Sequence, residues 1–438
     1  MSRVVVWRSG LLAPSETFVR AQAHALTRWH ARFLGAVKVP SPLAEESDVI
    51  VFPERPAKPR RSAGGRDALG SQQPDRQASR GSDAGFLRLR LSGRSPHLRR
   101  VLASLDPDVV HAHFGGDGWL ISRAAADLGV PLIVTLHGHD VTRQPYAKGM
   151  KGVRYRRNLR SVFRRAAIIL AVSEHIRRLA IARGADPSKV RVHHTGVPIP
   201  PLPQVEKRWD VVFVGRFVPK KGLDDLVEAV AMLPDLAPRV LLVGDGPLMA
   251  PLRARVAHLG VDVTFAGALN HAAAQECMAA AKVFASPSRT APDGDSEGLP
   301  TTLLEAAARG VPVISTVHSG IPEAVIQGTT GLLSAEGDRA ALASHLRTLL
   351  TDNDLRERLG RQARAHVRAH FDLKNQTRRL ENIYDEVTEA AAAITAPAAD
   401  HETAPAATPQ VTHDAAAIVA PRVPRPRTPA PPELGPFR

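Results

Sequence analysis

Residues 293–310, D-G-D-S-E-G-L-P-T-T-L-L-E-A-A-A-R-G, join a polar loop to a helix. Pro300 suits the first helical position, because its missing N–H would have no partner there, and Gly310 ends the helix. Glu297 would then lie at the mouth of the helix N-terminus, with Glu305 about one and a half turns inside it. Free N–H groups at a helix N-terminus attract phosphate, and carboxylates accept hydrogen bonds from hydroxyls. The stretch therefore suits a nucleotide sugar, although two ordinary surface glutamates are the alternative interpretation.

Short apolar runs alternate with segments of helical length on both sides of this stretch. In the first half, the runs predicted to form strands cover residues 3–7, 32–37, 48–52, 109–113, 132–136, 168–172 and 190–193. In the second half, they cover residues 211–214, 240–243, 261–265, 283–286 and 313–315. Strands that alternate with helices predict right-handed crossovers, and hence an α/β fold with a parallel, doubly wound sheet in each half.

A proline-rich segment, G-V-P-I-P-P-L-P-Q-V at residues 196–205, separates the two halves. Such a segment is stiff and forms no core, so it predicts a domain boundary. We predict a first domain over 1–195, a linker over 196–208, a second domain over 209–373, a helix over 374–392 and a disordered Ala/Pro-rich tail over 393–438. Within the first domain, residues 54–94 are rich in Pro, Arg, Ser and Gly, so we expect a mostly disordered basic insert. Ligands of two such sheets would bind in a cleft at the carboxyl ends of the strands.

The composition limits the classes of partner. The chain has 438 residues, a formal net charge of +15 and a single cysteine, Cys277. The positive charge is compatible with nucleic acid, anionic lipid or phosphorylated ligands. One cysteine excludes an internal disulfide, and its neighbours predict an ordinary helix. No apolar run reaches the roughly 18 residues of a membrane span. We expect a cytoplasmic protein, with contact to a membrane surface left open.

A basic turn follows the first strand of the second half. Gly215 allows the backbone to approach a ligand closely, Arg216 offers a planar fork, and Lys221 is a compact charge near the next helix. Together they suit a diphosphate, and a solvated basic turn is the alternative. Gly244 lies in a second strand-to-helix turn, whose composition is also that of an ordinary tight turn.

Histidines follow two strands of the first half. His111 and His113 share one face of their strand, because side chains alternate with a period of two, and His137 ends the next strand with Asp140 close behind. A metal site made from these four residues is one hypothesis. Their spacing matches no established ligand signature, so a structural or substrate-bonding role is favoured.

The helix predicted around residues 151–165 carries six arginines with apolar residues interleaved. This pattern is compatible with binding to an anionic surface. A crossover helix with a solvated basic face is the commoner explanation of the same pattern.

The chain resembles glycosyltransferases of family 4, which have the GT-B fold of two Rossmann-like domains. The matching motifs of the second half are G-R-F-V-P-K-K-G (215–222), G-D-G-P (244–247), E-G-L-P-T-T-L-L-E-A (297–306) and G-V-P-V-I-S-T-V-H-S-G-I-P-E (310–323). Those of the first half are S-E-T-F-V (15–19), H-A-H-F-G (111–115) and T-L-H-G-H-D (135–140). The combination is most similar to exopolysaccharide enzymes of the colanic-acid and amylovoran type. The resemblance covers roughly residues 3–384 apart from the insert.

The resemblance implies a donor site in the second half. Arg216 and Lys221 would hold the donor diphosphate and stabilise its leaving charge. Glu297 would bond the donor sugar and Glu305 the ribose hydroxyls. The remaining donor-site residues would offer backbone groups, and they are Gly215, Gly244, Thr301 and Thr302.

The resemblance also implies a facing surface in the first half. His137 would meet the sugar or the acceptor across the cleft, with His113 and Asp140 on the acceptor side. The helix over 374–392 would cross back towards the first domain. Many relatives carry a Gly-Gly loop after the first strand, whereas Arg8-Ser9-Gly10-Leu11 stands here, so the acceptor contacts stay open.

The expected activity is a retaining transfer of a hexose from a nucleoside-diphosphate sugar to a glycan or polyprenyl-linked glycan, in exopolysaccharide or cell-surface polysaccharide synthesis. The sequence has no Asp-x-Asp motif serving a donor diphosphate, so we expect no metal and no other cofactor. A sugar-nucleotide 2-epimerase of the same fold is one alternative. A nucleic-acid-binding protein is another, but the aromatic content of 4% disfavours it, and we expect no nucleic-acid partner.

Overall fold

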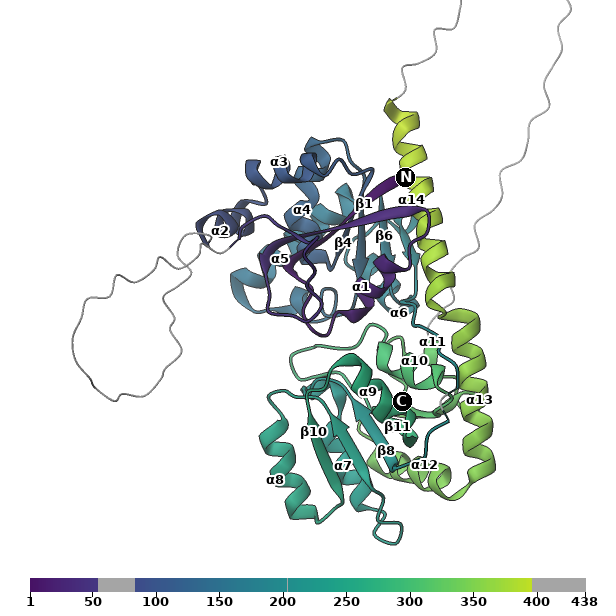
Figure 1. The fold of residues 1–438 in the computed structure, drawn as a ribbon. Coiled ribbons are helices and arrows are strands. Elements are labelled where there is room, and N and C mark those ends of the chain that lie inside the picture. The colour runs from purple at the N-terminus through teal and green to yellow at the C-terminus, as the bar shows by residue number, and fades with distance from the viewer. Residues whose placement is uncertain (54–82, 203, 396–438) are drawn as a thin grey trace, which may run out of the picture. The chain divides into compact units, whose positions relative to one another are not determined.

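The first parallel sheet is built from the N-terminal half of the chain. The computed structural model describes residues 1–53, 83–202 and 204–395 (Figure 1). The strands of this sheet are β1 (Ser2–Leu11), β2 (Trp29–Lys38), β3 (Val49–Ile50), β4 (Val109–His113), β5 (Leu132–Leu136), β6 (Ile168–Ala171) and β7 (Val190–Val192). Their order is β3-β2-β1-β4-β5-β6-β7, and neighbouring strands are parallel. The helices of this half are α1 (Thr17–His24), α2 (Asp83–Ser92), α3 (Pro96–Ser104), α4 (Gly115–Asp127), α5 (Gly149–Arg165) and α6 (Glu174–Ala182).

The second half forms another parallel sheet. Its strands are β8 (Trp209–Val214), β9 (Val240–Val243), β10 (Val263–Gly267), β11 (Ala281–Ala285), β12 (Val313–Thr316) and β13 (Gly331–Ser334), in the order β10-β9-β8-β11-β12-β13. Its helices are α7 (Leu223–Ala231), α8 (Met249–Leu259), α9 (His271–Ala279), α10 (Thr301–Ala308), α11 (Ile321–Ala324), α12 (Arg339–Thr351) and α13 (Asn353–His370). The prediction of two doubly wound parallel sheets is confirmed.

The strand order reverses beside the first strand of each sheet. β1 lies between β2 and β4, and β8 lies between β9 and β11. Open α/β sheets bind ligands in the crevice at such a reversal, outside the carboxyl ends of the strands. Met1–Thr395 form one compact unit, and the predicted limits of the two domains within it stay predictions.

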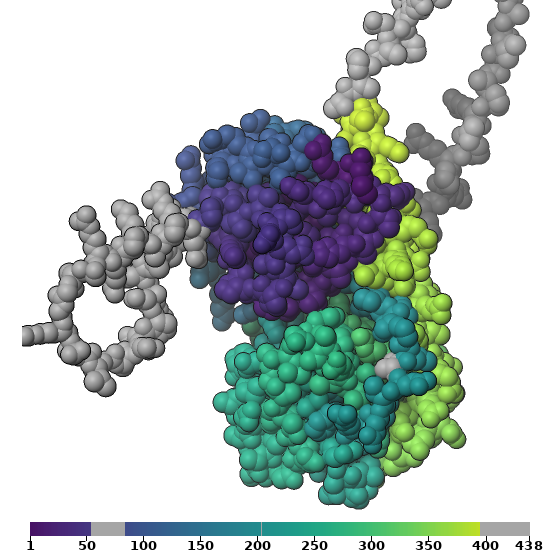
Figure 2. All heavy atoms as spheres, in the orientation of Figure 1, coloured from purple at the N-terminus to yellow at the C-terminus, as the bar shows by residue number. Residues whose placement is uncertain are grey.

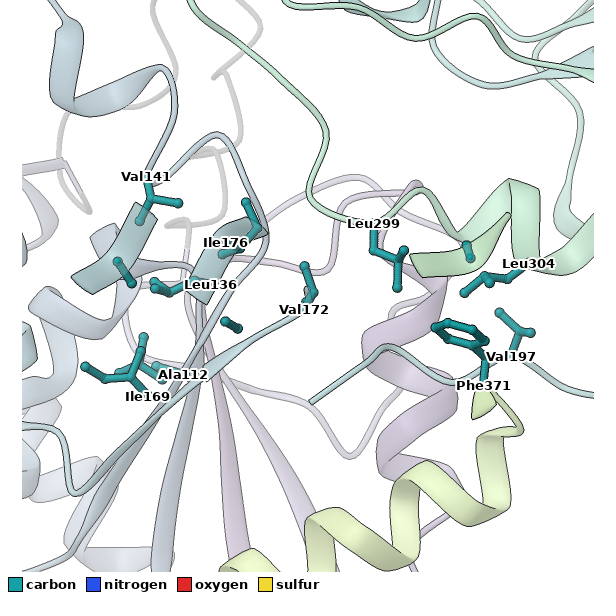
Figure 3. Close-up of a cluster of buried hydrophobic side chains, with 14 of the residues drawn as sticks. Ala112, Leu136, Val141, Ile169, Val172, Ile176, Val197, Leu299, Leu304 and Phe371 are labelled. Atoms are coloured by element: carbon teal, nitrogen blue, oxygen red, sulfur yellow. The ribbon is translucent and has the colours of Figure 1, made fainter. Parts of the chain in front are cut away.

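One hydrophobic cluster extends from the first sheet to the start of α10 (Figure 3). Its members in the first half include Ala112, Leu136, Ile169, Val172 and Ile176. Those near the second sheet include Val197, Leu299, Leu304 and Phe371. Leu299 lies between Glu297 and α10, in the segment 293–300 that we call the carboxylate loop, so burying its side chain fixes the position of the polar residues around it. Burial of a side chain of this size stabilises a fold by about 1.5–3 kcal/mol.

Helix α14 (Leu373–Thr395) follows α13 and packs on the first sheet. The two helices form the yellow-green strip along one side of Figures 1 and 2. The carboxylate of Glu381 accepts hydrogen bonds of 2.6 Å from the backbone N–H groups of Thr27 and Arg28. The hydroxyl of Tyr384 lies 2.7 Å from Nδ1 of His111 in β4. These buried contacts attach the C-terminal helix to the N-terminal sheet.

Two helix starts differ by one residue from those that the sequence predicts. Serine is a preferred N-cap residue, so Ser15 predicts a helix that starts directly after it, but α1 begins at Thr17 and Glu16 occupies the N-cap position. The carboxylate of Glu16 instead pairs with Arg8, which fixes its position before the helix begins. Pro300 is the N-cap of α10 and not its first helical residue, because its ψ of 115° is extended.

Part of the expected disordered insert is a helix, α2. Leu89 is fully buried, and the ring of Phe86 lies 6.2 Å from that of Phe52. These two apolar side chains give the segment a face to bury, so it can form a helix. The predicted insert over 54–82 lies outside the described residues, and so does the predicted tail from residue 396. Residues 393–395 belong to α14, which therefore extends beyond its predicted end. Among the described helices, none is long and apolar enough to cross a bilayer.

Candidate functional site

The carboxylate loop and the basic turn of the second sheet meet at one point. Glu297 Oε1 lies 2.9 Å from Lys221 Nζ, and Glu297 Oε2 lies 3.8 Å from Lys220 Nζ. Lys220 is itself buried, and its ammonium lies 3.3 Å from Asp295 Oδ1. Two ammonium groups therefore converge on one buried carboxylate at the carboxyl end of the sheet.

The electrostatics of Glu297 follow from this pairing. Burial would raise the pKa of its carboxyl group, but the charges of Lys221 and Lys220 lower that pKa to about 2. Glu297 is thus ionised at neutral pH. Its Oε1 atom pairs with the Lys221 ammonium, and a carboxylate oxygen has a second lone pair that can accept a further hydrogen bond.

The backbone of the carboxylate loop is fixed from two directions. The N–H of Glu297 donates to Nε2 of His318 at 3.1 Å, and Nδ1 of that ring lies 2.6 Å from Glu336. On the other side, a Cβ atom added to Gly298 would lie 2.1 Å from the carbonyl oxygen of His137. The loops that carry Glu297 and His137 are therefore in backbone contact, and this contact requires glycine.

The first turn of α10 offers a free polar atom. Thr302 Oγ1 is buried and has no hydrogen-bond partner in the described part of the chain. The turn begins at the N-cap Pro300, next to the ion pair of Glu297. Backbone N–H groups at a helix N-terminus attract anions, so Thr301 and Thr302 are suited to a phosphate.

Glu305 lies deeper in α10 and has a different environment. Its Oε2 accepts a hydrogen bond of 2.6 Å from Nε2 of Gln275 in α9. Burial raises the pKa of its carboxyl group to about 7, with the amide of Gln275 and the charge of Arg309 acting in the opposite direction. Gln275 Oε1 is a further buried atom without a partner among the described residues. The pair Glu305–Gln275 can thus bond additional hydroxyls.

Arg216 and the glycines lie in turns that touch each other. The side chain of Arg216 is exposed and makes no ion pair with the described residues, so its fork is available for an anion. Gly244 has a φ of 140°, and a Cβ atom there would lie 1.9 Å from the carbonyl oxygen of Gly215. Only glycine permits this approach of the two turns.

The histidines of the first sheet form a stack. The ring of His113 lies 4.5 Å from that of His111 and 5.2 Å from that of His137. His113 Nδ1 also lies 3.0 Å from His137 Nε2. Burial lowers the pKa of all three imidazoles, to about 3 for His111, and the guanidinium of Arg8 lowers those of His113 and His137 further. The rings are therefore neutral at neutral pH.

The proposed acceptor-side carboxylate is turned towards the backbone. Asp140 is fully buried and accepts hydrogen bonds from the N–H groups of Gly138 at 2.9 Å and Gly115 at 3.1 Å. Its position fixes the loop that carries His137 (Asp140 Oδ1 lies 3.2 Å from the N–H of His137). Within the described ranges, no group of histidine, cysteine or carboxylate side chains is arranged to hold a metal ion. The four-residue metal hypothesis therefore has no geometric support.

Sequence reasoning missed two cations and one amide at this site. The motif G-R-F-V-P-K-K-G (215–222) contains both Lys220 and Lys221, but the prediction assigned a role only to Lys221. The two consecutive lysines could have indicated that both ammonium groups reach the site. Gln275 gave no signal, because its relation to Glu305 depends on how α9 packs on α10. Arg8 stands at the position where many relatives have a Gly-Gly loop. It forms ion pairs with Glu16 and Asp117 and donates to the carbonyl of His113 at 3.2 Å.

Known proteins resemble this chain in both halves. Residues 15–199 match the model of "Glycosyltransferase Family 4", and residues 199–366 match that of "Glycosyl transferases group 1". The chain is 31% identical over 294 residues to a putative colanic acid biosynthesis glycosyltransferase, WcaL, of Salmonella typhimurium, with 63% of this chain and 70% of the relative covered. It is 28% identical over 289 residues to the amylovoran biosynthesis glycosyltransferase AmsK of Erwinia amylovora, covering 64% and 70%.

Solved structures share the fold of this chain. Anabaena HepE in complex with UDP has a TM-score of 0.68 at 20% identity, covering 88% of this chain and all of that one. Sucrose-phosphate synthase of Thermosynechococcus elongatus has a TM-score of 0.65 at 19% identity, covering 89% of this chain and all of the other. Two doubly wound parallel sheets of this kind form the GT-B fold. The chain belongs to glycosyltransferase family 4.

Proposed function

We propose that the chain transfers a hexose, with retention of configuration, from a nucleoside-diphosphate sugar to a glycan or polyprenyl-linked glycan. The observation that carries this proposal is the convergence of Lys220 and Lys221 on Glu297 beside the start of α10. Fixed ammonium groups stabilise a diphosphate leaving group, and an ionised carboxylate bonds sugar hydroxyls. HepE has been solved with UDP-glucose, and that ligand supports the choice of donor class.

Unsatisfied polar atoms support the same ligand. Thr302 Oγ1 and Gln275 Oε1 are buried without hydrogen-bond partners among the described residues. Buried polar groups are normally paired, so these atoms suit a ligand that brings phosphate oxygens and hydroxyls. In this arrangement Arg216, Lys221 and the first turn of α10 hold the diphosphate, Glu297 bonds the sugar, and Glu305 with Gln275 bonds the ribose.

The reaction proposed is a front-face attack by the acceptor hydroxyl as the diphosphate leaves, without a protein nucleophile. His137 would bond the sugar or the acceptor from the first sheet, where its neutral imidazole can donate or accept a hydrogen bond. The positive charge comes from Arg216 and the two lysines, so we propose that the reaction requires no metal ion. Chelation should then leave the rate unchanged, and rescue of a chelated enzyme by manganese would contradict this part of the proposal.

The biological setting is proposed from the relatives. WcaL and AmsK are described as enzymes of colanic acid and amylovoran biosynthesis. We propose that this chain acts in exopolysaccharide or cell-surface polysaccharide synthesis, in the cytoplasm at the inner face of the plasma membrane.

A donor panel tests the proposed reaction. Ligand binding to the native state raises its melting temperature, so one of the UDP-, GDP- or ADP-sugars should raise it. Release of the nucleoside diphosphate should depend on added acceptor, and proton NMR should show that the anomeric configuration is retained. Conversion of the donor alone to its 2-epimer would instead establish the epimerase. Inversion in the transferred sugar would contradict the retaining mechanism.

A further inference from the structure

The outer side of α5 carries a row of basic side chains. Its exposed basic residues are Lys151, Arg156, Arg157, Arg160, Arg164 and Arg165. Among the described residues, none of them forms an ion pair with a carboxylate. Arg156 donates to the carbonyl of Pro145 at 2.7 Å, and Arg165 bonds Ser161 in its own helix.

Several arginines elsewhere in the fold are paired with carboxylates. Arg20 forms an ion pair with Asp48, Arg191 with Glu386, and Arg347 with Asp235. On α5 the neighbouring charges repel instead. Burial lowers the pKa of the Arg165 guanidinium most. The charges of Arg123, Arg164 and Arg94 lower that pKa further, whereas the charge of Asp127 raises it. The basic side chains of α5 therefore form a positive patch, which an anion from outside the chain can neutralise.

Two hollows follow this side of α5. One, of about 440 Å³, is lined by Val153, Arg156, Arg157, Arg160 and Arg164. The other, of about 430 Å³, lies between the end of α2, the middle of α4 and the C-terminal half of α5, and its lining includes Leu91, Trp119, Arg123, Arg157, Arg164 and Arg165. Arg157 and Arg164 line both hollows. Each hollow has room for a phosphate group beside several guanidinium forks, which bind phosphate well.

Large apolar side chains are exposed on the same elements. On α5 these are Met150, which is 79% exposed, and Val153. On α2 they are Leu87 and Leu91, with Tyr146 just before α5. α2 and α5 are joined directly, because the guanidinium of Arg154 donates to the carbonyl of Arg90. Basic and apolar side chains thus share one surface, which we call the α2–α5 face.

We propose that the α2–α5 face is a docking surface for a bilayer that contains anionic phospholipid. Arg157 and Arg164 bind lipid phosphates in the two hollows, while Met150, Val153 and Leu91 enter the boundary between headgroups and acyl chains. Helices with arginines and exposed apolar residues on one side bind membrane interfaces in this manner. Duplex nucleic acid offers the same phosphates but no apolar layer, so the exposed methionine, valine and leucines favour lipid.

The face also bears on the reaction. α5 follows β5 through the loop of His137, so its N-terminal end lies at the same edge of the first sheet as the candidate site. Docking through Met150 would bring that edge close to the bilayer, where a polyprenyl-linked acceptor resides. This consequence rests on the proposed function, whereas the docking surface does not.

Vesicle flotation with the full chain tests the proposal. The wild-type protein should float with vesicles of phosphatidylcholine mixed with phosphatidylglycerol and not with phosphatidylcholine alone. Arg157→Glu combined with Arg164→Glu should weaken binding at least tenfold. The control, Arg358→Glu with Arg379→Glu, changes the net charge equally at exposed sites on α13 and α14, and it should retain most of the binding.

A second variant tests the apolar contribution. The Met150→Ser, Val153→Ser double variant keeps every charge. At high salt, where electrostatic attraction is screened, its affinity for the anionic vesicles should be at least threefold lower than that of the wild type. Melting temperatures and donor-induced shifts show whether each variant is folded, and they measure the proposed reaction site independently of lipid binding. Equal binding by wild type and the Arg157/Arg164 variant would overturn the proposal. Tighter binding of duplex DNA than of anionic vesicles, lost in that same variant, would also overturn it.

Discussion

Lys221 Nζ and Glu297 Oε1 lie 2.9 Å apart, although the two residues come from loops that follow different strands of the second sheet. Lys220 approaches the same carboxylate from the other oxygen. Glu297 is buried, Lys221 is partly buried, and α10 begins four residues beyond Glu297. A cation suited to a diphosphate and a carboxylate suited to sugar hydroxyls are therefore adjacent at the carboxyl end of the sheet.

Replacement of Lys221 by alanine should reduce turnover by about 10²-fold or more, because it removes a charge aimed at the leaving diphosphate. Initial rates of nucleoside-diphosphate release measure this. Lys374→Ala, which removes an exposed lysine at the start of α14, is the matched control and should leave the rate unchanged. A Lys221→Ala enzyme with a near-normal rate would remove this residue from the mechanism.

The pH dependence of stability should report the pairing of Glu297. Its folded-state pKa of about 2 lies below the ordinary value of 4.5. The stabilisation is therefore complete above about pH 4.5 and is lost as the pH falls towards 2, with a size on the order of 3 kcal/mol. In urea titrations over this range, Glu297→Gln should be less stable than wild type at about pH 6, and the difference should shrink on acidification. A constant difference would show that the charge of Glu297 is not the cause.

Glu305 should produce the opposite slope. Its pKa is raised to about 7, so the folded state binds a proton that the unfolded state releases near pH 4.5. Stability should fall as the pH rises from about 4.5 to 7, and Glu305→Gln should remove this part of the decline. Melting temperatures across this interval measure the effect. Glu276→Gln, on the exposed side of α9, is the control and should keep the wild-type slope.

Tyr384→Phe should destabilise the attachment of α14 to the first sheet. The change leaves Nδ1 of the buried His111 without its partner at 2.7 Å, and an unsatisfied buried group costs about 1–3 kcal/mol. Urea denaturation measures the loss, and Tyr146→Phe serves as an exposed control. A Tyr384→Phe protein as stable as wild type would show that water or a shifted side chain satisfies the ring.

The sheets were predictable from sequence because buried parallel strands are short apolar runs between helices of regular length. The strand ends were less predictable: β1 continues to Leu11, since Arg8 is held by Glu16 and Asp117 and does not enter a loop. α2 was missed because its stability depends on contacts of Phe86 and Leu89 with distant residues. The composition of residues 54–94 is mostly polar, and composition alone therefore predicts disorder there rather than a helix.

The candidate site was predictable where motifs carried it and unpredictable where packing did. Glu297 and Lys221 are brought together as the motifs indicate. The orientation of Asp140 towards the backbone, the environment of Glu305 and the neutral histidine stack depend on burial, which no local pattern encodes. Whether the predicted catalytic residues act as expected stays a prediction.

Calorimetric titration of UDP, GDP and ADP into the wild-type protein and into the Arg216→Ala, Lys221→Ala double variant tests the central claim most directly. The account predicts that at least one of the three diphosphates binds the wild type and that its affinity falls at least tenfold in the folded double variant. Equal affinity in the two proteins would contradict the claim that these cations hold the diphosphate of the donor.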